Sequence, residues 1–375
     1  MTPTILEAHG KFIPDPISLT KEDLPYHGTS TNNRWTTPIP ASPTYLAAGS
    51  RATTFYNKLD YVLSDRASND PVGSAGNPGG GAWGAIRRWS MPVFVCPDSD
   101  PKKTVILSEN WGGNSGSIAN VPWPSGIKCD PAGDGHLCII NADTLCQYDF
   151  YDVVHSADGT PTLDGSSNGQ AAFGNASNLA QDAGYFRSST VGQKATGARA
   201  SGTTIQAGLI FPHELVAGEI NHALACSYPF QSQYIFRIED GGAGKNSGGA
   251  ITDNTDFTLG AKLQLDPALS VDTLASTFGW KNYEIIMARA IQDYGIIMVD
   301  GGGYTPQRMG FYFENPMQYG SNPYASVHSD LSGDDVQCTF MADIRTDLLL
   351  LDDSARVDKN SIGDSTEKNL CNGWT

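Results

Sequence analysis

The stretch Gly197–Leu224 reads GARASGTTIQAGLIFPHELVAGEINHAL, and the rest of the chain is organised around it. Small residues at its start permit close backbone approach and unusual φ values. An apolar run, 207–211, leads into four ionisable side chains within ten residues: His213, Glu214, Glu219 and His222. The pattern predicts a strand, a turn at Val216–Gly218 and a second strand. The four side chains either face solvent or form a site, because buried charge is costly unless it is paired or used.

The composition favours many short strands joined by turns and long loops. The chain has 375 residues with 41 Gly and 22 Pro, and only 17% of its residues are charged. We therefore predict a mainly β fold, an antiparallel β-sandwich of jelly-roll type with long loops and one principal α-helix, at Trp280–Tyr294. Residues 1–50, rich in Pro and Thr, are predicted to form an extended N-terminal arm. Residues 51–375 are predicted to form a single large β-sandwich domain.

Local patterns predict several further elements. Residues 86–95 and 103–107 read as paired strands, and Ser50–Ser64 reads as a short helix. Alternation on both sides of a turn predicts a hairpin of His136–Asn141 with Leu145–Tyr151. The apolar run 296–299 predicts a buried strand that ends directly at Asp300.

Charge disfavours two classes of partner. The formal net charge of −16 repels phosphate backbones and anionic membrane surfaces, so neither nucleic acid nor a membrane is expected as a partner. The first residues, MTPTILEAHGKF, lack the charged and apolar regions of a signal peptide, as a chain that starts at the mature protein would.

Seven cysteines without a CxxC pair argue against a zinc ribbon and, in a loop-rich chain of low charge, favour an oxidising, extracellular setting. The favoured local disulfide joins Cys129 and Cys138, which flank a Pro-Ala-Gly-Asp-Gly turn. Cys371 is a second candidate, with Cys338 or another cysteine as its partner. The odd number leaves at least one thiol unpaired in a monomer.

Five side chains at strand ends are the candidate catalytic residues: Asp134, His136, Glu214, His222 and Asp300. A carboxylate beside an imidazole orients it and raises its basicity, as a general base or a metal ligand requires. The alternative for Asp134-Gly135-His136 is an Asx-turn followed by a core histidine. The alternative for Asp300 is a loop cap, although the glycines after it would let a ligand approach.

Several motifs together resemble a widespread family of secreted proteins, found mainly in soil bacteria and often joined to carbohydrate-binding modules. The resemblance covers about residues 85–315 and is carried by the following residues: Asp134-Gly135-His136, Gly197-Ala198 with Ala200-Ser201-Gly202, Glu214 with Gly218–Leu224, Gly260–Pro267, and Tyr294-Gly295 with Asp300. It implies a secreted protein and a polysaccharide substrate.

Three functions follow as hypotheses. The first is a polysaccharide-degrading glycoside hydrolase acting on a neutral glycan, with Glu214 as the acid and Asp300 as the partner carboxylate; a lyase would instead use His222 or a tyrosine as its base. The second is a non-catalytic glycan-binding or structural module. The third is a divalent metal site with Asp134, His136 and His222 as ligands. Candidate substrate contacts are Trp111, Trp123, Tyr185 and Arg199.

Overall fold

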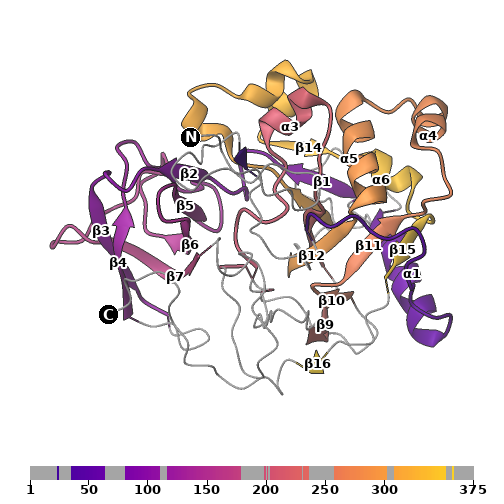
Figure 1. Ribbon diagram of the computed structural model, residues 1–375, viewed down its shortest axis with the longest axis horizontal. Helices are drawn as coiled ribbons and strands as arrows, with labels where there is room; N and C mark the ends of the chain where they lie inside the picture. Colours follow the sequence, from indigo (N-terminus) through magenta and orange to yellow (C-terminus); the bar gives the residue numbers. More distant parts are fainter. Residues whose placement is uncertain are drawn as a thin grey trace, which may run out of the picture.

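A computed structural model describes residues 23–24, 35–63, 81–109, 116–178, 198–199, 201, 203–229, 231–235, 257–301, 308–351 and 357–358. The fold is mainly β, with two large sheets and a few helices gathered at one of them (Figure 1). Among these residues, no helix is long and apolar enough to cross a lipid bilayer.

The first large sheet has six strands in the order β2-β5-β6-β7-β3-β4. Their bounds are β2 Val93–Cys96, β3 Lys102–Leu107, β4 Gly116–Pro122, β5 Leu137–Asn141, β6 Cys146–Val153 and β7 Gly169–Asn178. The predicted hairpin of β5 and β6 is confirmed, with Cys138 opposite Asp149. The predicted pairing of 86–95 with 103–107 is wrong, because β2 pairs in parallel with β5, whereas β3 pairs with β4 and β7.

The second large sheet has seven strands in the order β14-β1-β13-β8-β12-β11-β15. Their bounds are β1 Ala82–Ala85, β8 Leu224–Tyr228, β11 Lys262–Leu265, β12 Ile296–Gly301, β13 Met309–Tyr312, β14 Asp335–Gln337 and β15 Leu348–Leu350. A small third sheet joins β10 Phe257–Leu259, β9 Gln231–Ile235 and β16 Val357–Asp358. Both large sheets mix parallel and antiparallel pairs, so the antiparallel jelly-roll prediction is not confirmed.

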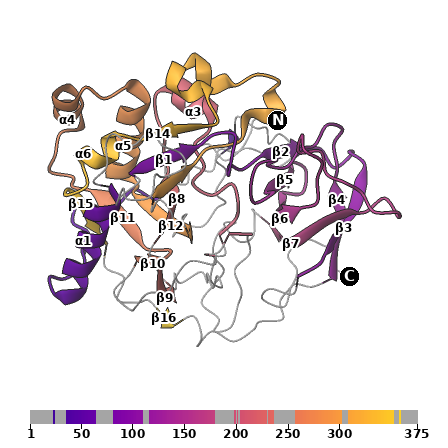
Figure 2. The same cartoon turned by 180° about the vertical axis from the view of Figure 1, so that it is seen from behind.

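The helices pack around the seven-stranded sheet. They are α1 Ser50–Leu63, α3 Pro212–Ala217, α4 Val271–Phe278, α5 Asn282–Asp293 and α6 Phe340–Asp343, with short 3₁₀ turns at Pro316–Tyr319, Pro323–Ser326 and Ser329–Ser332. The predicted helix at 280–294 is confirmed as α5. It is not the one principal helix, because α1 is longer, with 14 residues against 12. The view from behind shows both helices on the side of the molecule away from the six-stranded sheet (Figure 2).

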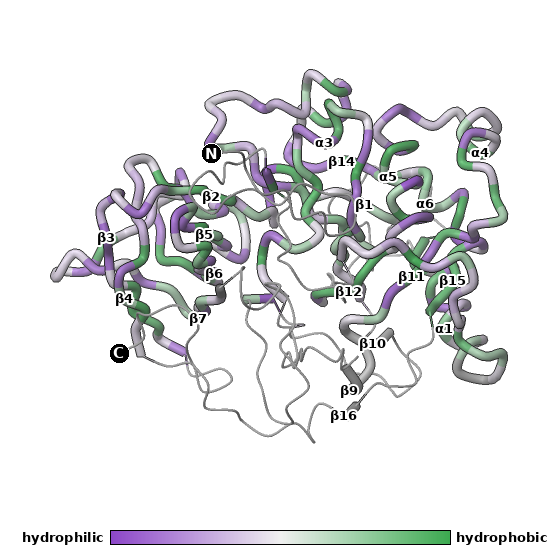
Figure 3. The backbone as a smooth tube through the Cα atoms, in the orientation of Figure 1, coloured by the Kyte–Doolittle hydropathy of each residue, from purple (hydrophilic) through white to green (hydrophobic). Residues whose placement is uncertain are grey.

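Alternation along the strands divides the core into layers. In β12, Ile296 and Met298 face the helices, whereas Ile297 and Val299 face the six-stranded sheet. The hydrophobic cluster that contains Ile297 and Val299 also contains residues of the six-stranded sheet, so the two large sheets pack face to face. In Figure 3 the hydrophobic residues of β5, β11 and β12 lie along this core.

Only part of the predicted N-terminal arm lies within the described residues. Its Trp35 is fully buried between the sheets, and the Trp35 carbonyl accepts a hydrogen bond from the Ala223 N–H at 2.7 Å. A Cβ at Gly208 would lie 2.2 Å from the Trp35 ring, so this glycine makes room for the indole. Of the described part of the arm, Leu24 and Trp35 are therefore packed into the core, whereas residues 36–49 are half-buried or exposed. The prediction that residues 51–375 form one domain stays a prediction.

The cysteines contradict the predicted bridge. Cys129 and Cys138 are both buried thiols that are not joined in a disulfide, and Cys96, Cys226 and Cys338 are buried thiols as well. Cys146 is disulfide-bonded, and Cys371 lies outside the described residues. Cys138 lies within β5, and its side chain packs between the two large sheets. It is therefore not directed toward Cys129 at the other end of the preceding turn. Most of the described cysteines are thiols and Cys146 is in a disulfide, so the extracellular setting stays a prediction.

Candidate functional site

The segment 130–136, which we call the Asp134 loop, precedes β5 and is fastened to the end of β6. The Asp134 carbonyl accepts the Asp152 N–H at 2.7 Å, and the Gly135 carbonyl accepts the Val153 N–H at 3.2 Å. Gly135 has a φ of 55°, and a Cβ there would lie 2.9 Å from the Val153 nitrogen, so only glycine fits. The loop therefore holds Asp134 in a fixed position.

Asp134 has the electrostatics of a proton donor. Its side chain is partly exposed, and burial, followed by the charge of Asp152, raises its pKa to about 6. Burial, opposed by a hydrogen bond from the Ala132 N–H, also raises the pKa of Asp130 in the same loop to about 6. A carboxyl that is half-protonated near pH 6 can give up a proton under mildly acidic conditions.

His136 projects from the end of the Asp134 loop into the interior. Its ring lies edge-on to Tyr151 of β6, with 5.4 Å between ring centroids. Burial, aided by the charge of Arg199, lowers the pKa of His136 to about 3, and its Nδ1 has no hydrogen-bond partner among the described residues. His136 is therefore a neutral imidazole between the sheets, which agrees with a core histidine better than with a general base.

Asp300 comes from the opposing sheet. A register shift between Met298 and Asp300 in β12 places Asp300 opposite Ser227 of β8. Ser227 hydrogen-bonds the Tyr312 hydroxyl, so these side chains share the face that looks toward the six-stranded sheet. Asp300 is partly exposed, and its carboxylate accepts the Gly301 N–H at 2.8 Å.

Two tyrosines lie within the electrostatic reach of both Asp134 and Asp300. Burial first, then the charges of Asp134 and other carboxylates including Asp300, raises the pKa of Tyr151. Burial and then Asp300 raise the pKa of Tyr312 well above its ordinary value. Tyr151 belongs to one large sheet and Tyr312 to the other, so the Asp134 loop and the end of β12 meet across the interface between the sheets.

Arg199 lies fully buried against Tyr312. Its guanidinium carbon is 4.6 Å from the Tyr312 ring centroid, and its Nη2 donates to the Ile205 carbonyl. Its Nε and Nη1 have no hydrogen-bond partner in the part of the chain that the structure describes. Burial lowers the pKa of Arg199, and the nearby carboxylates of Asp300 and Asp149 oppose that shift. Arg199 thus supplies positive charge between the sheets, beside the predicted Asp300.

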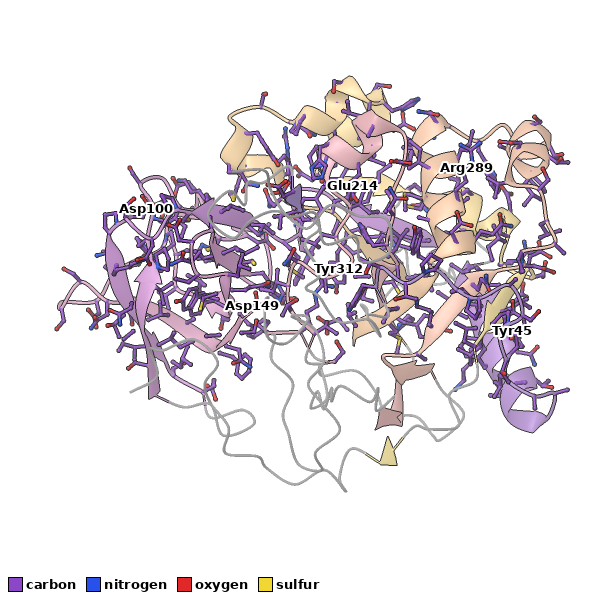
Figure 4. All side chains as sticks on the ribbon, viewed as in Figure 1. Tyr45, Asp100, Asp149, Glu214, Arg289 and Tyr312 are labelled. Carbon is purple, nitrogen blue, oxygen red and sulfur yellow. The ribbon has the colours of Figure 1, made fainter. Side chains whose placement is uncertain are left out.

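A buried polar row continues from this point along β6. Asp149 accepts the Ile205 N–H at 2.8 Å and the Gln147 amide at 2.7 Å, and Gln147 in turn accepts from the Gln206 amide at 3.0 Å. Burial raises the pKa of Asp149 to about 6. Figure 4 shows Asp149 and Tyr312 in the middle of the molecule, with Glu214 on α3 above them. The row ties the segment after Arg199 to the six-stranded sheet.

Glu214 and His222 form a separate pair. Glu214 lies on helix α3, where the sequence predicted a strand and turn, and His222 lies in the loop before β8. Pro212 occupies the first helical position, where its missing N–H costs nothing, and Gly218 ends α3 with a φ of 84°. The Glu214 carboxylate accepts the Phe211 N–H at 3.1 Å and lies 3.0 Å from His222 Nε2. His222 Nδ1 donates to the Ala223 carbonyl at 2.8 Å. These bonds give both side chains a structural role at the start of α3.

The structure thus divides the five predicted catalytic residues into two groups. His136 and Asp300 lie near Arg199, and Asp134 shares Tyr151 and Tyr312 with Asp300. Glu214 and His222 instead pair at α3. Asp134, His136 and His222 do not assemble as metal ligands: the described residues contain no group of three His, Cys, Asp or Glu side chains placed to hold a metal ion.

Of the three aromatic residues predicted to contact substrate, Trp123 lies within the described residues. Trp123 packs against Gly169 and Val105, and a Cβ at Gly169 would lie 2.9 Å from its ring. Trp111 and Tyr185 lie outside the described residues. The sequence did not identify Tyr151 and Tyr312, the two tyrosines that lie near both Asp134 and Asp300. It also did not identify Trp89 beside the Asp134 loop. Alternation along β6 relative to the confirmed hairpin was a usable signal for Tyr151.

Comparisons with protein-family models, with curated proteins and with solved structures find no match for this chain.

Proposed function

We propose that this protein is a polysaccharide-degrading glycoside hydrolase in which Asp134 is the general acid and Asp300 the partner carboxylate. The observation that carries the proposal is the arrangement of these two partly exposed carboxyls. Asp134 lies in the loop before β5 of one sheet and Asp300 lies in β12 of the other, and the charges of both act on Tyr151 and Tyr312. Glycoside hydrolysis needs one protonated carboxyl for the leaving oxygen and one ionised carboxylate as base or nucleophile.

The proposal moves the acid from Glu214 to Asp134. Glu214 is engaged by the Phe211 N–H and by His222, so its oxygens are committed to α3. Asp134 has a pKa of about 6 and is partly exposed, which suits a donor that must meet substrate.

Hydrolysis is preferred to the lyase alternative because of the tyrosines. A lyase needs a base, and the pKa values of Tyr151 and Tyr312 are both raised, which keeps the two hydroxyls protonated at neutral pH. The net charge of −16 also favours a neutral glycan over a uronate polymer. The motif resemblance supports a polysaccharide substrate and an extracellular location, which we retain as part of the proposal.

The test is the release of reducing sugar from a panel of neutral and acidic polysaccharides, measured between pH 4 and pH 8. We expect cleavage of a neutral glycan, with a rate that falls above about pH 6 as Asp134 loses its proton. Binding without any release of reducing sugar would support the glycan-binding module instead. Activity that requires an added divalent cation would support the metal-site hypothesis.

A further inference from the structure

Trp89 is a large exposed side chain in a strained backbone conformation. It is 44% exposed and has a φ of 57°, in the left-handed region that non-glycine residues rarely adopt. Single exposed apolar residues are common on proteins and need no explanation. A bulky residue held with a positive φ is uncommon, and such strain gathers at functional sites.

The strain at Trp89 lies against the Asp134 loop. A Cβ at Gly133 would lie 2.4 Å from the Trp89 ring, so the indole rests directly on the glycine next to Asp134. The backbone N–H of Trp89 donates to the carboxylate of Asp130 in the same loop. Asp152, whose N–H bonds the Asp134 carbonyl, also has a positive φ, of 52°. Two of the strained non-glycine residues in the described part of the chain therefore contact this one loop.

The segment that carries Trp89 is fixed from both sides. The Asn315 amide donates to the Arg87 carbonyl at 3.2 Å and to the Ser90 hydroxyl at 2.9 Å. The N–H groups of Ile86 and Arg87 both bond the Asp334 carbonyl. Because these hydrogen bonds hold the segment in place, the exposed Trp89 indole loses little rotational freedom when a ligand binds to its exposed face.

We propose that Trp89 is the stacking platform of a sugar-binding subsite beside Asp134, and this inference rests on the proposed hydrolase. An indole face accepts the apolar C–H face of a pyranose ring, while the sugar hydroxyls find acceptors in nearby carboxylates. The bound ring would place the neighbouring glycosidic oxygen toward Asp134. The ligand class is a neutral oligosaccharide, because the carboxyls of Asp130, Asp134 and Asp152 around the platform would repel an anionic sugar.

The first test is binding of neutral oligosaccharides, from the same glycan panel, to the full-length chain by calorimetry and by quenching of tryptophan fluorescence. We expect Trp89→Ala to weaken binding by about tenfold with an unchanged melting temperature. The matched control is Phe278→Ala, which removes another exposed aromatic side chain, 36% exposed on α4, and should leave binding unchanged.

A second variant tests the support rather than the indole. Gly133 has no positive φ, so Gly133→Ala keeps the backbone but pushes the indole from its seat. We expect it to weaken oligosaccharide binding as Trp89→Ala does, although the indole is still present. Binding that is unaffected by both variants would overturn the inference.

The outcomes separate this inference from the proposed hydrolase. Glycan cleavage that is insensitive to Trp89→Ala refutes the subsite and leaves the hydrolase standing. Trp89-dependent binding without cleavage refutes the hydrolase and leaves the subsite standing. Loss of self-association in Trp89→Ala, with oligosaccharide binding intact, would identify the indole as a protein contact and overturn the subsite.

Discussion

The Asp134 loop and the start of α3 each carry a carboxylate and an imidazole that are near in sequence, yet the two pairs differ in how their polar atoms are satisfied. At α3, Glu214 and His222 bond each other and adjacent backbone groups. At the Asp134 loop, burial raises the pKa of Asp134, and His136 keeps an unbonded Nδ1. Polar groups that satisfy one another stabilise a fold, whereas polar groups held at a cost are available for chemistry.

The largest expected effect is on catalysis. Asp134→Asn and Asp300→Asn should each reduce the rate of glycan hydrolysis by about 10²- to 10⁴-fold, because each removes a proton-transfer group. In Asp134→Asn, the new amide resembles the protonated carboxyl that the fold favours, so the stability of this variant at neutral pH should not fall. Hydrolysis rates and thermal melting of both variants check this.

A control for these variants is Asp272→Asn, which breaks an exposed ion pair with Arg289 on the helical side of the molecule. Exposed pairs contribute little to stability, so both its activity and its melting should match the wild type. Full activity in Asp134→Asn would reject the Asp134 loop as the site.

The second effect is on stability. Glu214→Ala and His222→Ala should each lower the free energy of unfolding by about 3–5 kcal/mol, because each leaves a buried polar partner unmatched. Glu214→Gln should cost less, since its amide oxygen still accepts the Phe211 N–H. Denaturant unfolding measures these values. Normal stability combined with lost activity would restore the pair as the catalytic centre.

The third effect is the pH dependence of stability through Asp149. Burial raises its folded-state pKa to about 6, above its unfolded value, so its contribution is fully present below about pH 4 and is lost as pH rises through 6. The loss is on the order of 2–3 kcal/mol. Asp149→Asn should flatten the fall in unfolding free energy between pH 4 and pH 7, as measured by denaturant titration at each pH.

Asp164 provides the opposite case for comparison. Hydrogen bonds from the backbone and side chain of Asn168 lower its pKa, so its contribution is present at neutral pH and is lost on acidification. Asp164→Asn should therefore leave the slope between pH 4 and pH 7 unchanged. An equal flattening in both variants would contradict the assignment to Asp149.

The smallest effect is a shift in the pH–rate profile. Asp152 raises the pKa of Asp134, so Asp152→Asn should move the alkaline limb of hydrolysis to lower pH by a few tenths of a unit. Asparagine tolerates the positive φ at this position, which keeps the loop intact. A shift toward higher pH would show that another group controls the limb.

The elements that depend on local sequence patterns were predicted correctly. The β5–β6 hairpin, strand β12 and helix α5 follow from alternation, an apolar run and helical periodicity. The stretch 207–224 was misread because α3 has only six residues, too few for its periodicity to appear, although Pro212 and Gly218 are start and stop signals. The parallel pairs of both sheets join segments distant in sequence, which no local pattern encodes.

The candidate site was predicted in part. Asp134 and Asp300 were chosen because each was expected to flank an apolar strand. Asp134 does precede β5, whereas Asp300 lies within β12, which runs on to Gly301. The rule could not tell them from Glu214, because hydrogen-bond satisfaction depends on tertiary contacts. Trp89 was read as a strand residue, and its positive φ depends on the contacts of its segment with Gly133 and Asn315.

The pairing of β1 has a consequence for how the chain is made. Ala82 lies beside Met309 of β13, and Trp83 lies opposite Gln337 of β14, so β1 meets both of its neighbours only late in synthesis. Contacts of such long sequence separation form slowly and leave strand edges open in the meantime. A nascent chain that ends before β13 therefore leaves β1 without either of its partner strands, and such open strand edges favour aggregation until the later strands are made.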